Sequence, residues 1–462
     1  MDADISMRID RSRTRGLIRL IPVFLLAFCL LGLVGVAAAA EDGRESGTYP
    51  AYYGIYQVSP DHVVGIDRFA SDSGETWMLM SDYRTGVVRR LFPVSPTEFE
   101  MGPSFSLRYP VRLKVRFVRD ARGNVTGISL HPIDGTTAHA KRIALLEHAV
   151  TIHDGKVTLS GTLMVPATLG PHPAIILLHG SGPLTRYSFG PYPHFFASLG
   201  LAVLVYDKRG TGASTGIRVD ASTTGTQGRI VQEYYPDGLA DDALAAFRLL
   251  RERRDIDPAR IGVWGSSEGG MLATYVASRN ANVAFAINSS GFMGPFSETF
   301  LYQLGATLRA SGIPPGQIDE ALAFGRLWLD VSRTGEDYQR FLEEREKALR
   351  QKRPWVSSRD PPSLEQMRWD WTHVFSFDPL PALANVRCPV LGLWGQLDTY
   401  TDAREAERRM RTVLAKSGNK DFTLKIFPNA DHPLTEMPSR ARMAPGVFET
   451  LRAWIRRRVR GR

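Results

Sequence analysis

The sequence predicts an α/β fold, in which helices cover both faces of a mostly parallel sheet, preceded by an all-β accessory domain. Three observations support this prediction. Short apolar runs typical of buried strands recur after about residue 145, segments with helical spacing separate them, and residues 48–135 instead form short alternating stretches divided by turn residues. A chain of 462 residues is long enough for two such units.

In the β-rich part, 48–135, Val111–Phe117 alternates apolar and basic residues, and a turn leads into a second strand at Val125–Leu130. The α/β part is expected at residues 145–462. Its helices include one that starts after Pro236-Asp237 and a last one around Leu451. Its buried strands are expected at Ala174–Leu178, Leu201–Tyr206, Ile261–Trp264, Val283–Ile287 and Val390–Trp394.

The alternation is interrupted between about residues 291 and 381. This stretch is rich in Phe and Trp at broadly helical spacing, from Phe292 to Trp371. We interpret it as a helical cap. Its aromatic residues are expected to hold the cap together, and some of them to line a substrate pocket.

The charge distribution argues against nucleic acid as a partner. The formal net charge is +9, but residues 1–40 contribute +2 and the six arginines of residues 452–462 contribute +6. The body of the chain is therefore close to neutral and offers no basic stripe. The only cysteines, Cys29 and Cys388, cannot form a disulfide framework or a zinc site.

The first 40 residues have the layout of a secretory signal peptide. An arginine-rich stretch precedes an apolar run from Leu20 that ends in Ala38-Ala39-Ala40. We therefore expect a periplasmic or secreted protein. The alternative is an uncleaved membrane anchor, which would leave the remaining chain on the same side of the membrane. Without that anchor, no stable membrane partner is expected.

A nucleophile is predicted at Ser267. It lies in Gly265-Ser266-Ser267-Glu268-Gly269, directly after a predicted strand and before a helical segment, which fits the G-x-S-x-G turn. That sharp turn requires very small residues two positions on either side of the nucleophile. Gly265 and Gly269 meet this requirement for Ser267, whereas Trp264 and Glu268 would flank Ser266.

The base and the acid are expected on loops at the carboxyl edge of the sheet. His432 lies in a polar loop after the apolar segment Phe422–Phe427, where it can take the proton of a serine. Asp398 follows the strand that ends near Trp394 and is placed to orient the imidazole. Asp402 is the alternative acid, although it also suits the cap of the next helix.

The oxyanion hole is predicted from two backbone amides. Glu268 follows the nucleophile at the start of a helix, and Ser181 lies in the loop His179-Gly180-Ser181-Gly182-Pro183 after a buried strand. Small residues there allow the backbone to approach a substrate closely. We assign His179 a structural role.

These motifs, together with Tyr206-Asp207-Lys208-Arg209-Gly210-Thr211-Gly212, resemble the α/β-hydrolase superfamily, in particular its bacterial esterases related to serine aminopeptidases. The resemblance covers residues 145–462 and implies an eight-stranded sheet, a cap after the sixth strand, and no metal or organic cofactor.

The expected function is that of an exported serine hydrolase that cleaves small carboxylic esters through an acyl-enzyme, using Ser267, His432 and Asp398. A peptidase or aminopeptidase, which would need a carboxylate for the substrate amine, supplied by Glu268 or by the cap, is an alternative. A thioesterase or acyltransferase is another. From a different class, the chain could be a non-catalytic protein that binds a partner in the cell envelope.

Overall fold

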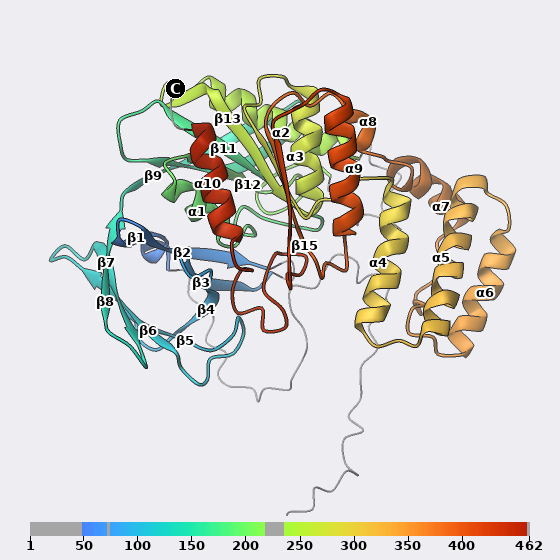
Figure 1. The fold of residues 1–462 in the computed structure, drawn as a ribbon, viewed down its shortest axis with the longest axis horizontal. Coiled ribbons are helices and arrows are strands. Elements are labelled where there is room, and N and C mark those ends of the chain that lie inside the picture. The colour runs from blue at the N-terminus through green and yellow to red at the C-terminus, as the bar shows by residue number, and fades with distance from the viewer. Residues whose placement is uncertain (1–48, 72–73, 218–234, 460–462) are drawn as a thin grey trace, which may run out of the picture.

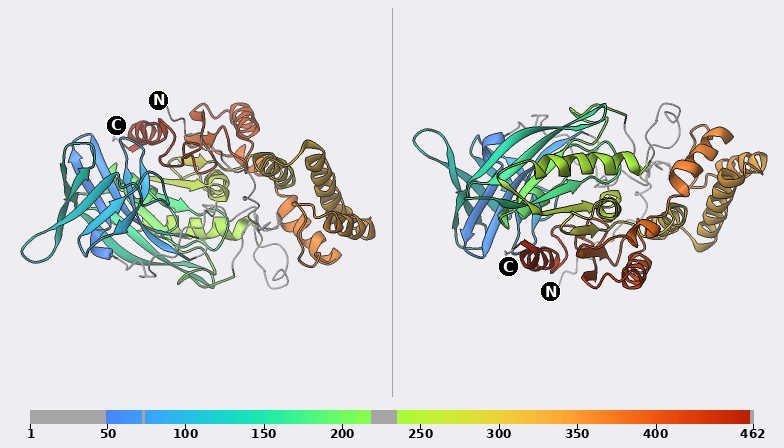
Figure 2. Two further views of the ribbon diagram at one scale, coloured as in Figure 1. Left: turned by 90° about the horizontal axis from the view of Figure 1, so that it is seen from below. Right: turned by 90° about the horizontal axis from the view of Figure 1, so that it is seen from above.

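The computed structural model describes residues 49–71, 74–217 and 235–459. It contains a closed barrel, an eight-stranded sheet flanked by helices, and a helical cap. The barrel and the cap lie at opposite ends of the molecule, with the sheet between them (Figures 1 and 2). The predicted signal segment lies outside the described residues. Within them, none of the helices combines the length and the apolar character that crossing a bilayer requires.

The N-terminal part forms an antiparallel barrel in which each strand pairs with the next and the first pairs with the last. Alternate side chains fill its interior, among them Tyr56, Met80 and Phe117. The barrel extends beyond the predicted limit at residue 135, because its last strand, β8, follows the turn at that position. The strands are β1 (Gly54–Ser59), β2 (His62–Ala70), β3 (Thr76–Asp82), β4 (Val88–Pro93), β5 (Glu98–Met101), β6 (Leu113–Arg119), β7 (Val125–Pro132) and β8 (Ala138–Ile143).

The second sheet has the strand order β16-β15-β14-β13-β11-β12-β10-β9. Neighbours from β16 to β12 run parallel, and β10 and β9 join as antiparallel strands. The five strands predicted from apolar runs are all present, with shifted ends, and the apolar segment Phe422–Phe427 forms strand β16. The strands are β9 (Leu145–Asp154), β10 (Val157–Pro166), β11 (His172–Leu178), β12 (Ala202–Tyr206), β13 (Ile256–Ser266), β14 (Ala286–Ser289), β15 (Val390–Gly395) and β16 (Phe422–Phe427).

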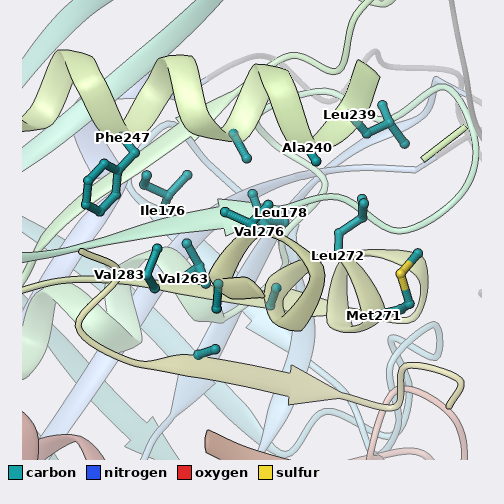
Figure 3. Close-up of a cluster of buried hydrophobic side chains, with 14 of the residues drawn as sticks. Ile176, Leu178, Leu239, Ala240, Phe247, Val263, Met271, Leu272, Val276 and Val283 are labelled. Atoms are coloured by element: carbon teal, nitrogen blue, oxygen red, sulfur yellow. The ribbon is translucent and has the colours of Figure 1, made fainter. Parts of the chain in front are cut away.

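Both faces of this sheet are buried, which explains why its parallel strands are continuous apolar runs. Ile176 and Leu178 of β11 pack on one side, against α2 and α3, as Figure 3 shows. Ile175 and Leu177 pack on the other side, against α1, α10 and the barrel. The covering helices are α1 (Tyr192–Ser198), α2 (Asp237–Arg251), α3 (Glu268–Arg279), α8 (Leu380–Leu383), α9 (Ala403–Lys416) and α10 (Val447–Val459).

The cap follows β14, the sixth strand of this sheet along the chain. It has its own core, in which Phe324 packs against Phe341 and Trp355. Phe300 and Phe375 instead contact the core of the sheet. The expectation that aromatic residues hold the cap together is confirmed, and some of them also attach the cap to the core of the sheet. The elements are α4 (Phe296–Ala310), α5 (Pro315–Thr334), α6 (Tyr338–Arg350), α7 (Leu364–Asp370) and η3 (Trp371–Phe375).

The barrel holds two loops that leave the carboxyl edge of the sheet. Ala70 N–H, at the end of barrel strand β2, donates at 3.0 Å to the carbonyl of Tyr187, which lies on the loop after β11. On the loop after β16, Met443 N–H donates to the Gly86 carbonyl at 2.8 Å, and Arg89 Nε donates to the Ala441 carbonyl at 3.1 Å. These bonds tie the barrel to two of the loops on which site residues were predicted, those of Ser181 and His432.

A buried ion pair adds to this attachment. His194 Nδ1, on α1, lies 2.7 Å from Asp67 Oδ1 on barrel strand β2, and both side chains are almost fully buried. Burial alone would lower the pKa of His194, but the charge and hydrogen bond of Asp67 outweigh it and raise that pKa. The contact between barrel and hydrolase-like part is thus both apolar and polar.

Candidate active site

Ser267 occupies a strained turn between β13 and α3. Its backbone has φ 60° and ψ −124°, a conformation that residues with side chains rarely adopt. The turn is held because Ser267 N–H donates to the Ser289 carbonyl at 2.8 Å. The conformation places a hydroxyl at the carboxyl edge of the sheet and at the positive end of a helix.

The two glycines of the turn are required by its geometry. A β-carbon on Gly265 would lie 2.0 Å from the Gly269 carbonyl oxygen, and one on Gly269 would lie 2.2 Å from the Leu178 carbonyl oxygen. Both positions would be blocked by backbone atoms, which cannot move aside as a flexible side chain can. This close packing agrees with the assignment of the nucleophile to Ser267 rather than Ser266.

His432 and Asp398 come together at the same edge. His432 Nδ1 lies 2.7 Å from Asp398 Oδ2, on loops that follow β16 and β15. The aspartate side chain is fully buried, while that of the histidine is 17% exposed. The other carboxylate oxygen of Asp398 accepts the N–H groups of Tyr400 at 2.7 Å and Thr401 at 2.9 Å. Both oxygens of the Asp398 carboxylate thus have hydrogen-bond partners, and Oδ2 faces His432 Nδ1 as the acceptor for its proton.

Two further aromatic residues support this pair. Tyr302, on cap helix α4, donates its hydroxyl to the Asp398 carbonyl at 2.7 Å. The ring of Tyr400 lies 4.8 Å from the ring of His432. Neither role was predicted, because Tyr302 lies in an aromatic-rich cap and Tyr400 is a single tyrosine in a loop, and neither has a local signal that distinguishes it from a packing residue.

The alternative residues have other roles. The Asp402 side chain accepts the Glu405 N–H at 3.1 Å and caps α9. His179 is buried, stacks on Phe189 and bonds through Nε2 to the Tyr206 carbonyl. Burial lowers the pKa of His179 to about 3, so it remains neutral and enclosed. Of the two aspartates considered as the acid, Asp398 is the one that contacts His432.

The loop predicted to supply the second oxyanion donor lies against the nucleophile. A β-carbon on Gly180 would be 3.6 Å from the Cβ of Ser267. Within the described part of the chain, the Ser181 N–H has no hydrogen-bond acceptor. That amide is thus available to an oxyanion. Glu268 opens α3, where the first amides have no acceptor within the helix.

The Glu268 carboxylate is not available to a substrate. Its Oε2 lies 2.6 Å from Lys208 Nζ, and both side chains are at most 2% exposed. The expectation that this carboxylate could hold a substrate amine is therefore wrong. In the sequence, Lys208 belongs to Asp207-Lys208-Arg209, three charged residues directly after buried strand β12. That placement was the available signal that their side chains are paired inside the protein.

The described residues differ from a fully assembled triad in one respect. Among them, no hydrogen bond joins the Ser267 hydroxyl to the His432 ring. Such bonds are often long in free enzymes and shorten when substrate binds. In the same residues, no group of three or more His, Cys, Asp or Glu side chains is arranged to hold a metal ion.

We predict an acid limb in the pH profile that lies above the ordinary histidine pKa of about 6.5. Burial disfavours protonated His432, but the charge and hydrogen bond of Asp398 outweigh burial and raise its pKa. A base must be neutral to accept a proton, so kcat/KM for an ester should fall as the pH drops through this raised value. Initial rates between pH 5 and 9 measure it, and a limb centred below pH 6 would contradict the prediction.

The comparisons with known proteins agree with this geometry. A family model described as "Alpha/beta hydrolase family" matches residues 175–443. Esterase EstD of Thermotoga maritima is 33% identical over 129 residues, which is 26% of this chain and 28% of that protein. The quorum-quenching protein AidA of Acinetobacter baumannii is 28% identical over 164 residues, 36% of this chain and 50% of that protein. The chain thus spans half or less of the length of these curated relatives.

Among solved structures, an esterase of Pyrococcus furiosus, Pf2001, is 17% identical with a TM-score of 0.43, covering 69% of this chain and 92% of that one. Proline iminopeptidase of Mycobacterium smegmatis is also 17% identical, with a TM-score of 0.40, covering 67% and 98%. The family model carries the assignment, because it matches more than half of the chain and spans the positions of Ser267, Asp398 and His432. The chain belongs to the alpha/beta hydrolase family.

Proposed function

We propose that this protein is an exported serine hydrolase that cleaves carboxylic esters of small molecules through an acyl-enzyme. The observation that carries the proposal is the 2.7 Å contact of His432 with buried Asp398, at the sheet edge where Ser267 occupies its strained turn. Membership of the alpha/beta hydrolase family and the similarity to esterase EstD support it.

In the proposed reaction, Ser267 Oγ attacks the carbonyl carbon of the ester while His432 Nε2 accepts its proton. The amides of Ser181 and Glu268 stabilise the resulting oxyanion. His432 then donates the proton to the departing alkoxide, which leaves an acyl group on Ser267. Finally, His432 deprotonates a water molecule that attacks the acyl carbon. The acid product then departs as His432 returns the proton to Ser267 Oγ.

Export remains part of the proposal and rests on the composition of residues 1–40, which lie outside the described residues. The near-neutral body of the chain supports a small-molecule substrate rather than nucleic acid.

The pairing of Glu268 with Lys208 favours an esterase over an aminopeptidase, because a buried and paired carboxylate at this position cannot bind a substrate amine. A thioesterase or acyltransferase would use the same three residues.

The test has two arms. First, a fluorophosphonate probe should label the wild-type protein at Ser267, which a non-catalytic binding protein would not permit. Second, p-nitrophenyl esters of graded acyl length are compared with acyl thioesters and aminoacyl amides. We expect the oxygen esters to show the highest kcat/KM. Faster turnover of aminoacyl amides or thioesters would reassign the substrate class, and absence of labelling would overturn the proposal.

A further inference from the structure

Lys208 connects the two segments that supply the oxyanion donors. Its Nζ donates to Glu268 Oε2 at 2.6 Å and to the Gly180 carbonyl at 3.0 Å. These partners lie at the start of α3 and in the loop after β11, while Lys208 itself follows β12. One ammonium group thus bridges three parts of the chain that are distant in sequence.

The bond to Gly180 acts on the peptide that contains the Ser181 amide. The Gly180 carbonyl and the Ser181 N–H belong to one planar peptide unit, and that peptide is trans. In a trans peptide the two groups point in opposite directions, so fixing the carbonyl fixes the direction of the N–H. A cation on the carbonyl oxygen also polarises the amide and makes its N–H a stronger donor.

The bond to Glu268 has a complementary effect. A lone carboxylate on the residue whose amide faces the oxyanion would repel the negative charge that develops in the reaction. Lys208 neutralises that carboxylate and fixes the first residue of α3. Because both charges are buried, the pair is held in one geometry and is little screened by solvent.

Stability alone is a weak reason for such a pair. Burying two charges is costly, and apolar residues of similar volume often serve equally well. The neighbouring residue shows the contrast. Arg209 Nε lies 2.7 Å from Asp242 Oδ2, with both side chains equally buried. This pair joins the segment after β12 to helix α2, Arg209 also contacts Asp154 on β9, and neither amide donor is touched.

We propose that Lys208 is a positioning residue for the oxyanion hole, which orients the Ser181 amide through Gly180 and neutralises Glu268. This inference rests on the proposed function. Lys208 does not touch the substrate in this arrangement and acts only through the two segments that it bridges.

The main test variant is Lys208→Met/Glu268→Met, which removes both charges and retains side-chain length. We expect kcat for a p-nitrophenyl ester to fall by about 10²-fold, the lower range for loss of one oxyanion donor, with KM within about threefold of wild type. The inhibition constant of a trifluoromethyl ketone, which forms an oxyanion on Ser267, should rise by a similar factor. A purely structural role would lower the melting temperature without this joint change.

Two comparisons make the outcome decisive. Arg209→Met/Asp242→Leu removes the matched buried pair and should leave kcat within about threefold of wild type. Lys208→Gln/Glu268→Gln removes both charges but keeps polar groups. It replaces the Met variant in the same measurements if the Met variant does not fold. A folded Lys208/Glu268 variant with near wild-type kcat would overturn this inference and leave the proposed function standing. Absence of ester turnover and probe labelling in the wild type would overturn the proposed function and the inference together.

Discussion

Replacing Ser267 by alanine is expected to lower kcat for ester hydrolysis by about 10⁴- to 10⁶-fold, because the proposed acyl-enzyme requires the Ser267 hydroxyl. The change removes only the hydroxyl oxygen, and alanine can retain the backbone bond from residue 267 to the Ser289 carbonyl. We therefore expect the circular dichroism spectrum to be unchanged and labelling by the fluorophosphonate to be lost.

The control for this variant is Ser266→Ala, one residue earlier at the end of β13. Its kcat should remain within a few-fold of wild type. If Ser267→Ala kept near wild-type turnover, or if the Ser266 variant were the inactive one, the nucleophile would be misassigned.

Replacing Asp398 by asparagine is expected to lower kcat by about 10⁴-fold through the wrong histidine tautomer. One carboxylate oxygen accepts two backbone N–H groups, from Tyr400 and Thr401, so the asparagine oxygen must take that position. Its NH₂ group then faces His432 Nδ1 and favours the tautomer with the proton on Nε2. That nitrogen can no longer accept the proton of Ser267.

Asp402→Asn is the matched control, since it makes the same chemical change four residues later. Asparagine caps helices as well as aspartate does, so both stability and kcat should stay close to wild type. Kinetics of the two variants at the pH optimum decide the assignment. A severe loss in the Asp402 variant together with an active Asp398 variant would exchange their roles.

Much of the hydrolase-like part could be predicted because its signals are local. The apolar segment Phe422–Phe427, recognised between polar loops, has the same ends as strand β16. Ser267 was distinguished from Ser266 by its flanking glycines. Both must be glycine, because a β-carbon at either position would collide with backbone atoms. His432 and Asp398 followed from their positions after strands, because parallel strands bring such loops to one edge.

The remaining features depend on contacts between residues far apart in the chain. Barrel closure pairs Ile55 with Ile143, and no pattern within either strand specifies that partner. Glu268 was expected to be accessible because an isolated carboxylate in a sequence normally is. Its partner, Lys208, lies 60 positions earlier, so only the three-dimensional structure shows that both charges are buried.

The position of the barrel in the chain has a consequence for folding. Synthesis proceeds from the N-terminus, and all eight barrel strands precede β11, while the segment that carries His432 is among the last to be made. Gly86 binds Met443 and Ala70 binds Tyr187 through backbone groups. In each pair the barrel residue is synthesised before its partner. The barrel groups that bind these two later loops are thus encoded in the part of the chain that is made first.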